Sequence, residues 1–286
     1  MLKTLLKWEP GFSHFEDTPL ISKNGSTAGW HSQIISHDGI TLGGGAHEKL
    51  NTAKRIAIAE VLERAVIKHL KNSEFSDLYK LKQYPTSSGF AAGFDKNPTL
   101  FRAICEAIER WAWSQWIDSH FKITLLDEMP KLSNLGQFYL EGFDRIQFYQ
   151  QKIKVESSQV GNLELKFGVA LGFSKKGIFP GSRVTSHKDD LWTHALLEAW
   201  RNKQIFEKLE NAHKVPQHFF PKRVLFFGSN SEFALNTLKM STKEEWPKPK
   251  LNFIKQVPIE DNFYIFRALC DDFIPWHEGT EKRFVY

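Results

Sequence analysis

Five glutamates and two arginines of this sequence have the residue types and spacing of a site for metal and phosphate chemistry. They fall in three phrases that share one pattern: a small residue, a branched apolar residue, any residue and then a glutamate. The phrases are A-I-A-E-V-L-E-R at 57–64, A-I-C-E-A-I-E-R at 103–110 and A-L-L-E-A-W-R-N at 195–202. The charged residues in them are Glu60, Glu63, Arg64, Glu106, Glu109, Arg110 and Glu198.

On a helix, E-x-x-E-R is ordinarily a solvated face, because Glu and Arg three or four residues apart form pairs worth about 0.2–0.5 kcal/mol. Helical geometry argues against that interpretation here. Glu63 projects between Ile56 and Leu70, inside the apolar stripe of its helix, and Glu198 projects among apolar neighbours of its own helix. We therefore expect these carboxylates to be withdrawn from water.

Glu106 and Glu109 lie on a more polar helix face, but Trp113 and Trp116 flank them. Burying an unpaired carboxylate costs several kcal/mol, so these glutamates need counter-charges. Two arginines leave an excess of negative charge if the five glutamates converge. Mg²⁺ commonly relieves such an excess, held by carboxylates together with the phosphates of a nucleotide. The pattern thus favours a shared metal and nucleotide site.

Three helices must position these residues, and we predict them at about 52–69, 99–118 and 190–210. Asn51 or Thr52 is the expected cap of the first helix. A glycine precedes each helix, at Gly45, Gly93 and Gly181, which suggests a glycine loop that leads into each helix. The spacing is too irregular for a solenoid. We interpret it as one structural unit used repeatedly within one compact fold.

The remaining segments suggest mainly strands. Residues 1–28 are predicted to be mostly loop, and a hairpin is expected from Trp30 to Leu42 around the turn Asp38-Gly39. Further strands are expected in FKITLL at 121–126, IQFYQQKIKV at 146–155, LELKFGVALGFS at 163–174, IFPGSRV at 178–184, RVLFFGS at 223–229 and FYIFRALC at 263–270. SEFALNTLKM at 231–240 is predicted as a short helix.

Composition limits the class of protein. The chain has 286 residues, 41% hydrophobic and 14% aromatic content and a net charge of +5 without a basic block, so it is globular and nucleic-acid binding is unsupported. Two cysteines give neither a disulfide framework nor a metal-ligand spacing. We see no signal peptide and no run long enough to span a membrane, so we expect a cytoplasmic protein with no membrane partner.

The three phrases resemble the motifs of the YcaO family. Its members carry a glycine-led helix ending in E-x-x-E-R, a second preceded by S-x-G-x-A-x-G, and a third ending in A-L-x-E-A. Here these correspond to Gly43–Arg64, Ser87–Arg110 and Gly181–Lys203, in the family's order. The resemblance implies an α+β fold, a mixed fold of repeated glycine-loop/helix units packed on β-sheet. It implies a single domain over 1–286, with the motifs in about 30–205 and strands and a tail in 206–286.

The resemblance also implies a chemistry. Members bind Mg²⁺ and ATP without a Walker-type loop, phosphorylate the oxygen of a peptide backbone amide, and let a nucleophile add to give an azoline or a thioamide. Carried over by position, the metal ligands are Glu63, Glu106, Glu109 and Glu198. Glu60 and Ser88 join them as nucleotide contacts, and Arg64 and Arg110 stabilise the developing charge. The implied partners are a peptide or protein substrate and a protein that delivers it. Independently of the resemblance, we also expect a homodimer.

The sequence departs from the family pattern beside these residues. Ile56 replaces a serine, Ser88 and Phe94 replace asparagines, and Pro98 replaces an acidic residue. Arg201 displaces a glutamine, and the Pro-x-Pro tail of azoline-forming members is missing. Three outcomes are therefore open: a divergent ATP-dependent enzyme, a nucleotide-binding protein without peptide chemistry, or a degenerate scaffold that binds a partner.

Overall fold

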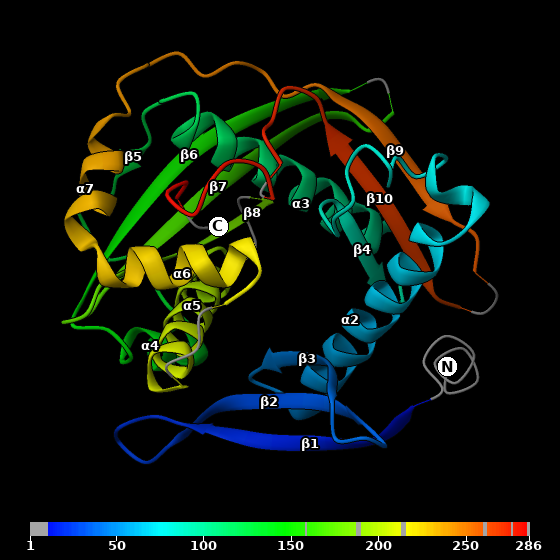
Figure 1. Ribbon diagram of the computed structural model, residues 1–286, viewed down its shortest axis with the longest axis horizontal. Helices are drawn as coiled ribbons and strands as arrows, with labels where there is room; N and C mark the ends of the chain where they lie inside the picture. Colours follow the sequence, from blue (N-terminus) through cyan, green and yellow to red (C-terminus); the bar gives the residue numbers. More distant parts are fainter. Residues whose placement is uncertain are drawn as a thin grey trace. The chain divides into compact units, whose positions relative to one another are not determined.

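The structure, a computed structural model, describes residues 11–157, 159–186, 190–212, 216–259, 262–275 and 277–284. It combines helices with three antiparallel sheets, which confirms the predicted α+β class (Figure 1). By its internal contacts the chain divides into two compact units, each drawn from separate stretches. Unit 1 comprises Met1–Ala107 and Leu251–Leu269, and unit 2 comprises Ile108–Lys250 and Cys270–Tyr286. The single domain over 1–286 stays a prediction.

Unit 1 begins with a meander of three strands, β1 (Phe12–Ile21), β2 (Thr27–Ser36) and β3 (Thr41–His47), in the order β1-β2-β3. The predicted hairpin is confirmed, with Ile35 opposite Thr41 and Gly39 at φ 75° in the turn. The loop prediction for residues 1–28 is wrong over β1; residues 1–10 lie outside the described part. β1 was not predicted because it lacks alternating apolar residues. It is an edge strand that is largely exposed on both faces.

Helix α2 (Leu50–Lys71) follows this sheet and packs on β2 and β3. It begins slightly earlier than predicted, and its N-cap is Lys49 without a side-chain cap bond, so Asn51 and Thr52 do not cap it. A short 3₁₀ turn, η1 (Glu74–Ser76), comes next. The buried face of α2, with Ala57, Val61 and Leu62, forms the core of unit 1 together with residues of β2, β4 and β10.

The second sheet of unit 1 has the order β4-β10-β9, from β4 (Phe90–Gly93), β9 (Leu251–Val257) and β10 (Tyr264–Cys270). β10 pairs antiparallel with β4, so segments far apart in the sequence are joined. Helix α3 (Lys96–Ile117) follows β4 and confirms the second predicted helix. The division between the units falls within α3, which assigns Glu106 to unit 1 and Glu109 to unit 2.

Unit 2 contains a sheet in the order β5-β6-β7-β8. Its strands are β5 (Thr124–Leu125), β6 (Arg145–Ser157), β7 (Gly161–Phe173) and β8 (Ile178–Ser186). The three long strands were predicted, whereas only two residues of 121–126 form a strand. The helices are α4 (Asn134–Leu140), α5 (Trp192–Ala212), α6 (Phe219–Ser229) and α7 (Ser231–Lys239). α5 and α7 confirm the predicted helices, and α5 packs on β7 and β8.

The prediction of a strand at 223–229 is wrong, because these residues lie in α6. Val224 and Phe227, three residues apart, are fully buried, while Leu225 and Phe226 keep some exposure. That spacing is helical, but a short apolar run such as RVLFF is compatible with either element until its packing is known.

The glycines that precede the helices lie in strands and not in the loops that we predicted. Gly45 is in β3 and Gly181 is in β8. A Cβ on Gly45 would lie 2.3 Å from the carbonyl oxygen of Ala53 in α2, and one on Gly181 would lie 2.1 Å from that of Ala195 in α5. Each glycine therefore lets its strand approach the next helix closely. The repeated unit is a glycine-bearing strand packed against a helix.

An aromatic cluster fills part of the core of unit 2. Trp113 and Trp116 of α3 meet edge to face with ring centroids 5.1 Å apart. Phe284, fully buried, packs 4.8 Å from Phe227 of α6 and 6.0 Å from Trp113. The segment 271–284 thereby completes the core.

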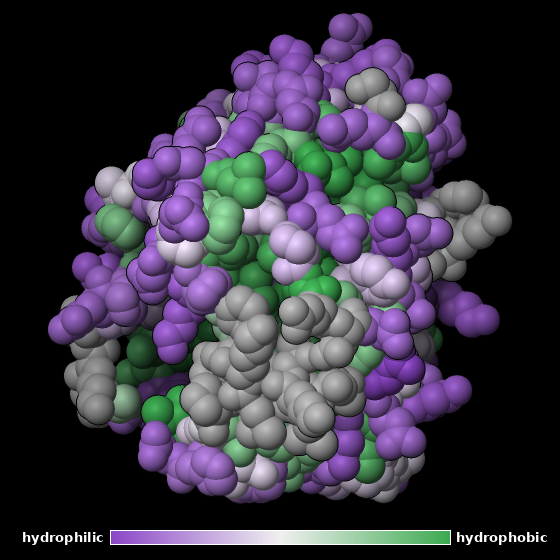
Figure 2. Space-filling view, turned by 90° about the vertical axis from the view of Figure 1, so that its right-hand side faces the viewer, coloured by the Kyte–Doolittle hydropathy of each residue, from purple (hydrophilic) through white to green (hydrophobic). Residues whose placement is uncertain are grey.

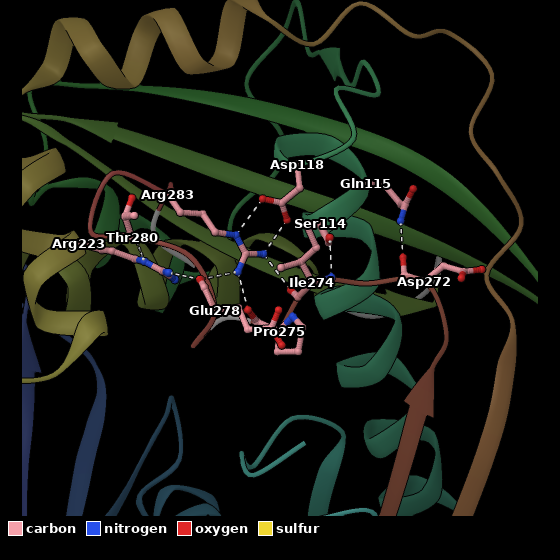
Figure 3. A network of polar contacts seen from close by, with 10 residues as sticks. All are labelled: Ser114, Gln115, Asp118, Arg223, Asp272, Ile274, Pro275, Glu278, Thr280 and Arg283. Atoms are coloured by element: carbon pink, nitrogen blue, oxygen red, sulfur yellow. Dashed lines mark hydrogen bonds and ion pairs between the residues drawn. The ribbon is translucent and has the colours of Figure 1, made fainter. Parts of the chain in front are cut away.

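A polar network fastens this segment to α3 and α6 (Figure 3). The Arg283 guanidinium donates to both carboxylate oxygens of Asp118, at 2.8 and 2.6 Å, and the two side chains are only 9% and 10% exposed. Arg223 donates to the carbonyl of Thr280 at 3.0 Å, and Ser114 accepts from the backbone N–H of Ile274 at 3.0 Å. Such a desolvated two-bond pair is strongly destabilising to break.

No helix in the described part of the chain is long and apolar enough to cross a membrane. On the face shown in Figure 2, hydrophilic residues cover most of the visible surface and hydrophobic residues appear between them in small groups. The cytoplasmic location stays a prediction.

Candidate functional site

Glu60 and Arg64 of α2 form an ion pair that fastens the helix to its sheet. A carboxylate oxygen of Glu60 accepts from the backbone N–H of Gly44 in β3 at 2.7 Å, and the other accepts from Arg64 at 2.5 Å. Arg64 also donates to the carbonyl of Leu42 at 3.1 Å. The Glu60 charge is therefore compensated within unit 1.

Glu63, one turn further along α2, lies in a less favourable environment. It is half-buried. Burial raises the pKa of Glu63 well above its ordinary value, the negative charges of Glu106 and Glu60 add to the shift, and Arg102 and Arg64 oppose it. A raised pKa means that the ionised carboxylate is disfavoured. Glu63 and Glu106 thus form an electrostatically coupled acidic pair between α2 and α3, within unit 1.

A buried cation that was not predicted from the sequence, Arg267, acts on Glu106 of this pair. Arg267 of β10 is fully buried and donates to the carbonyls of Tyr79, Tyr84 and Thr86, the last two at 2.7 and 3.4 Å. Burial lowers the pKa of Arg267 to about 10, and the negative charge of Glu106 opposes that shift. An arginine inside the apolar run FYIFRALC was the available signal, because a buried charge requires partners.

A pocket of about 170 Å³ opens in unit 1 between α2 and the start of α3. Its lining includes Ile56, Phe94 and Pro98, three of the positions that depart from the family pattern, together with Arg55, Ala59 and Arg102. Ala59 precedes Glu63 by one helical turn and Arg102 precedes Glu106 by one turn. The pocket therefore lies one turn from the acidic pair.

Ser88, predicted as a nucleotide contact, is buried in unit 1 beside Thr86. Its hydroxyl accepts from that of Thr86 at 3.0 Å, and its backbone N–H lies 3.3 Å from the same Thr86 oxygen. It is not among the described residues that line the pocket. Its predicted role stays a prediction.

In unit 2, Glu109 is 7% exposed and is fastened to β8. One carboxylate oxygen accepts from the hydroxyl of Ser182 at 2.8 Å and the other from the backbone N–H of Val184 at 3.2 Å. Arg110, the next residue of α3, is half-buried. The bonds of Glu109 suit a structural link between α3 and β8, and its predicted role as a metal ligand stays a prediction.

Glu198 of α5 faces Arg201, whose guanidinium donates to it at 2.9 Å, and it lies 3.8 Å from the ring of His194. Tyr139 of α4 lies in the field of this pair: burial raises its pKa, Arg201 opposes the shift and Glu198 adds to it. Tyr139 is 1% exposed, and among the described residues its hydroxyl has no hydrogen-bond partner. No sequence pattern pointed to Tyr139, which lies in a short helix outside the three motifs.

Each of the two compact units contains some of the predicted residues. Unit 1 contains Glu60, Glu63, Arg64, Ser88 and Glu106, and unit 2 contains Glu109, Arg110 and Glu198. Among the described residues, no group of three or more His, Cys, Asp or Glu side chains could hold a metal ion. Mg²⁺, however, is commonly held by one or two carboxylates together with phosphates. Glu63 and Glu106 supply two carboxylates that act on each other electrostatically, which is the number that such a site uses.

Comparison with solved structures identifies the fold. The chain matches the E. coli microcin synthetase McbBCD complex with pro-MccB17 bound, with a TM-score of 0.58 and 10% identity over 91% of this chain and 88% of that chain. It matches YcaO from Methanopyrus kandleri bound with AMPPCP and Mg²⁺, with a TM-score of 0.57 and 12% identity over 93% and 86%.

A third match is a heterocyclase in complex with substrate and cofactor, with a TM-score of 0.55 and 10% identity. It covers 98% of this chain, which spans about half, 53%, of that longer chain. No protein-family model and no curated protein matches the sequence. The structural relationship confirms the predicted YcaO-like fold.

Proposed function

We propose that this YcaO-like protein binds Mg²⁺ and ATP and activates a backbone amide of a peptide or protein. The observation that supports this most is the acidic pair Glu63 and Glu106, on the two helices of a fold shared with a YcaO protein solved with AMPPCP and Mg²⁺. Repulsion between two partly desolvated carboxylates is what a bound divalent cation relieves.

The chemistry proposed is phosphoryl transfer followed by addition. The γ-phosphoryl group of ATP is transferred to the amide oxygen and ADP leaves; a nucleophile then adds to the amide carbon, and phosphate departs with that oxygen. A Cys, Ser or Thr side chain of the substrate would give an azoline, and an external sulfur source would give a thioamide. A metal held by Glu63 and Glu106 would offset the negative charge of the phosphates.

The chain's own residues divide the work. Glu63 and Glu106 would hold the metal, and Arg64 and Arg110 would stabilise charge on the transferred group. Glu60 would keep α2 against β3 through Gly44. In this proposal Glu109 and Glu198 would act as metal ligands through acceptor sites that their bonds to Ser182 and Arg201 leave available.

Likeness to solved complexes with a bound substrate supports a peptide or protein substrate and a partner protein that presents it. We further propose that the protein acts in the cytoplasm and assembles as a homodimer. Light scattering on the purified chain measures the second point directly, since a monomeric mass would contradict it.

Thermal unfolding with and without MgATP tests the nucleotide site. A ligand at a hundred times its Kd adds about 2.7 kcal/mol of stability, which gives a clear rise in Tm. Glu63→Gln should abolish this rise, while Glu74→Gln, at an exposed glutamate of the same unit, should retain it. No rise at millimolar MgATP would reject the nucleotide site. A rise that survives Glu63→Gln would reject its assignment to the acidic pair.

A scaffold without catalysis is the second candidate, favoured by a specific observation. Positions 56, 94 and 98 give the pocket an apolar lining where the family pattern has polar or acidic residues, and Glu198 is paired with Arg201. This candidate predicts no release of ADP or phosphate from MgATP in the presence of candidate peptides. Phosphate release that requires Glu63 would exclude it.

A further inference from the structure

The pocket of unit 1 lies directly beside the residues that we propose to hold the metal and phosphates. On α2, Ile56 and Ala59 line it and Glu63 follows one turn later; on α3, Arg102 lines it and Glu106 follows one turn later. If the phosphates of a nucleotide lie at Glu63 and Glu106, the part of the nucleotide that extends toward Arg102 enters this pocket.

Three polar side chains around the pocket, Thr99, Arg102 and Arg55, have partners within the chain. The hydroxyl of Thr99 donates to the backbone carbonyl of Asp95 at 2.6 Å, and Arg102 donates to the carbonyl of Ala92 at 3.2 Å. Arg55 lies 3.7 Å from the carboxylate of Asp95. No Asn or Gln occurs among the described lining residues. Apart from Thr52 and Asp95, few side-chain donors or acceptors therefore remain to form hydrogen bonds with the edge of a base.

One wall of the pocket is instead suited to stacking. The Arg55 guanidinium lies 4.5 Å from the centroid of the Phe94 ring, and Phe263 supports that ring edge to face at 5.1 Å. Guanidinium and aromatic planes stack on bases with little regard to sequence, because every base has a π face. Ile56, Ala59 and Pro98 add apolar contact.

We propose that this pocket holds the base of the nucleotide by its face alone, so that the protein accepts the magnesium complexes of ATP, GTP, CTP and UTP nearly equally. This rests on the proposed function, because the phosphates must lie at Glu63 and Glu106. The specificity determinants are Ile56, Phe94 and Pro98. Apolar pockets discriminate weakly between ligands of similar shape, whereas sites that form hydrogen bonds to a ligand discriminate strongly.

The test measures the Kd of each nucleotide, and of tripolyphosphate without a base, for the full chain with Mg²⁺ by titration calorimetry. We expect the four nucleotides to agree within about tenfold and tripolyphosphate to bind at least about tenfold more weakly than all of them. A preference for one base above tenfold overturns the inference and leaves the proposed function standing. If tripolyphosphate binds as tightly as ATP, the inference about the base is overturned and the proposed function again stands. Absence of binding by all five ligands overturns both.

Phe94→Leu supplies the second measurement, with Phe75→Leu, at an exposed phenylalanine of the same unit, as its matched control. Leucine keeps apolar contact with Phe263 but removes the ring. We expect all four nucleotides to bind about tenfold more weakly and tripolyphosphate to be unchanged. An equal loss for tripolyphosphate would show general damage to the site, and unchanged nucleotide binding would show that the ring does not stack; either overturns the inference.

Discussion

The two glutamates of α2 and α3 at the second position of E-x-x-E-R meet different environments. Glu63, in unit 1, is half-buried, repelled by Glu106 and Glu60, and has a raised pKa. Glu109, in unit 2, is more deeply buried but accepts two hydrogen bonds from β8. The same motif position thus holds a carboxylate that is repelled by neighbouring negative charges in unit 1. In unit 2 it holds a carboxylate whose charge is stabilised by two hydrogen bonds.

The difference between Glu63 and Glu109 helps to distinguish residues that bind a ligand from residues that stabilise the fold. A charge that the fold does not compensate is a candidate for binding a ligand, whereas a charge with two hydrogen-bond donors mainly stabilises the fold. The contrast predicts opposite signs for the same chemical substitution in the two units. The predictions below test what the units share and then where they diverge.

The largest expected effect concerns what the units share, the glycine that lets a strand approach a helix. Gly45→Ala in unit 1 and Gly181→Ala in unit 2 should each lower the free energy of unfolding by about 3 kcal/mol, because the added methyl group meets helix backbone. Urea denaturation measures this.

Gly44→Ala is the matched control, since its Cβ would lie 3.1 Å from the end of the His31 side chain, which can move. We expect a loss well below that of Gly45→Ala. Equal losses at Gly44 and Gly45 would show that strand conformation, and not helix approach, requires the glycines.

Glu109→Ala should lower the free energy of unfolding by about 2 kcal/mol, because the hydroxyl of Ser182 and the N–H of Val184 lose their buried acceptors. Glu109→Gln should cost less, since its amide oxygen can accept from Val184 and its nitrogen can donate to Ser182. Chemical denaturation of both variants checks the order. If the Glu109→Ala variant were more stable than wild type, the ionised Glu109 carboxylate would destabilise the fold, as we infer for Glu63.

Glu63→Gln should act in the opposite direction and raise the stability of the ligand-free protein by about 1 kcal/mol near neutral pH, the size of an ordinary single-substitution effect. The folded pKa of Glu63 is raised above its ordinary value of 4.5, so the stability that Glu63 contributes is full below that value. It is lost as the pH rises through the folded pKa, because folding then requires an ionised buried group.

Denaturation from about pH 5 to about pH 8 measures this loss, and the difference between wild type and Glu63→Gln should grow with pH. Glu60→Gln is the control on the same helix, and it should destabilise, since Glu60 accepts from Gly44 and Arg64. If the difference in the free energy of unfolding between wild type and Glu63→Gln did not change with pH, the raised pKa of Glu63 would be contradicted.

The smallest effect is expected for Tyr139→Phe in unit 2. The Tyr139 hydroxyl is buried without a partner among the described residues, so its removal should change the free energy of unfolding by at most about 1 kcal/mol, neutral or stabilising. Thermal unfolding of wild type and variant checks this. A loss above that range would identify an interaction of this hydroxyl that supports unit 2.

Periodic apolar residues were sufficient to predict the three long helices, because α2, α3 and α5 each bury residues three or four positions apart, such as Ala57 and Val61 of α2. Composition of short runs was not sufficient: 223–229 is a helix, and β1 is an exposed edge strand. The burial of Glu63 followed from its helical position. Its coupling to Glu106 and the buried cation Arg267 depend on packing between distant segments, which no local pattern contains.

Segments near the C-terminus pack against segments near residues 90–113, and this order affects how the chain folds during translation. β10 pairs with β4, and Phe284 packs against Trp113, so both units contain residues that are synthesised long after their neighbours in space. Contacts between distant segments slow folding, because the chain must lose much freedom before they form. During translation, β4 lacks its partner strand β10, and Trp113 lacks its contact with Phe284, until these late residues emerge. We expect the growing chain to depend on chaperones over that interval.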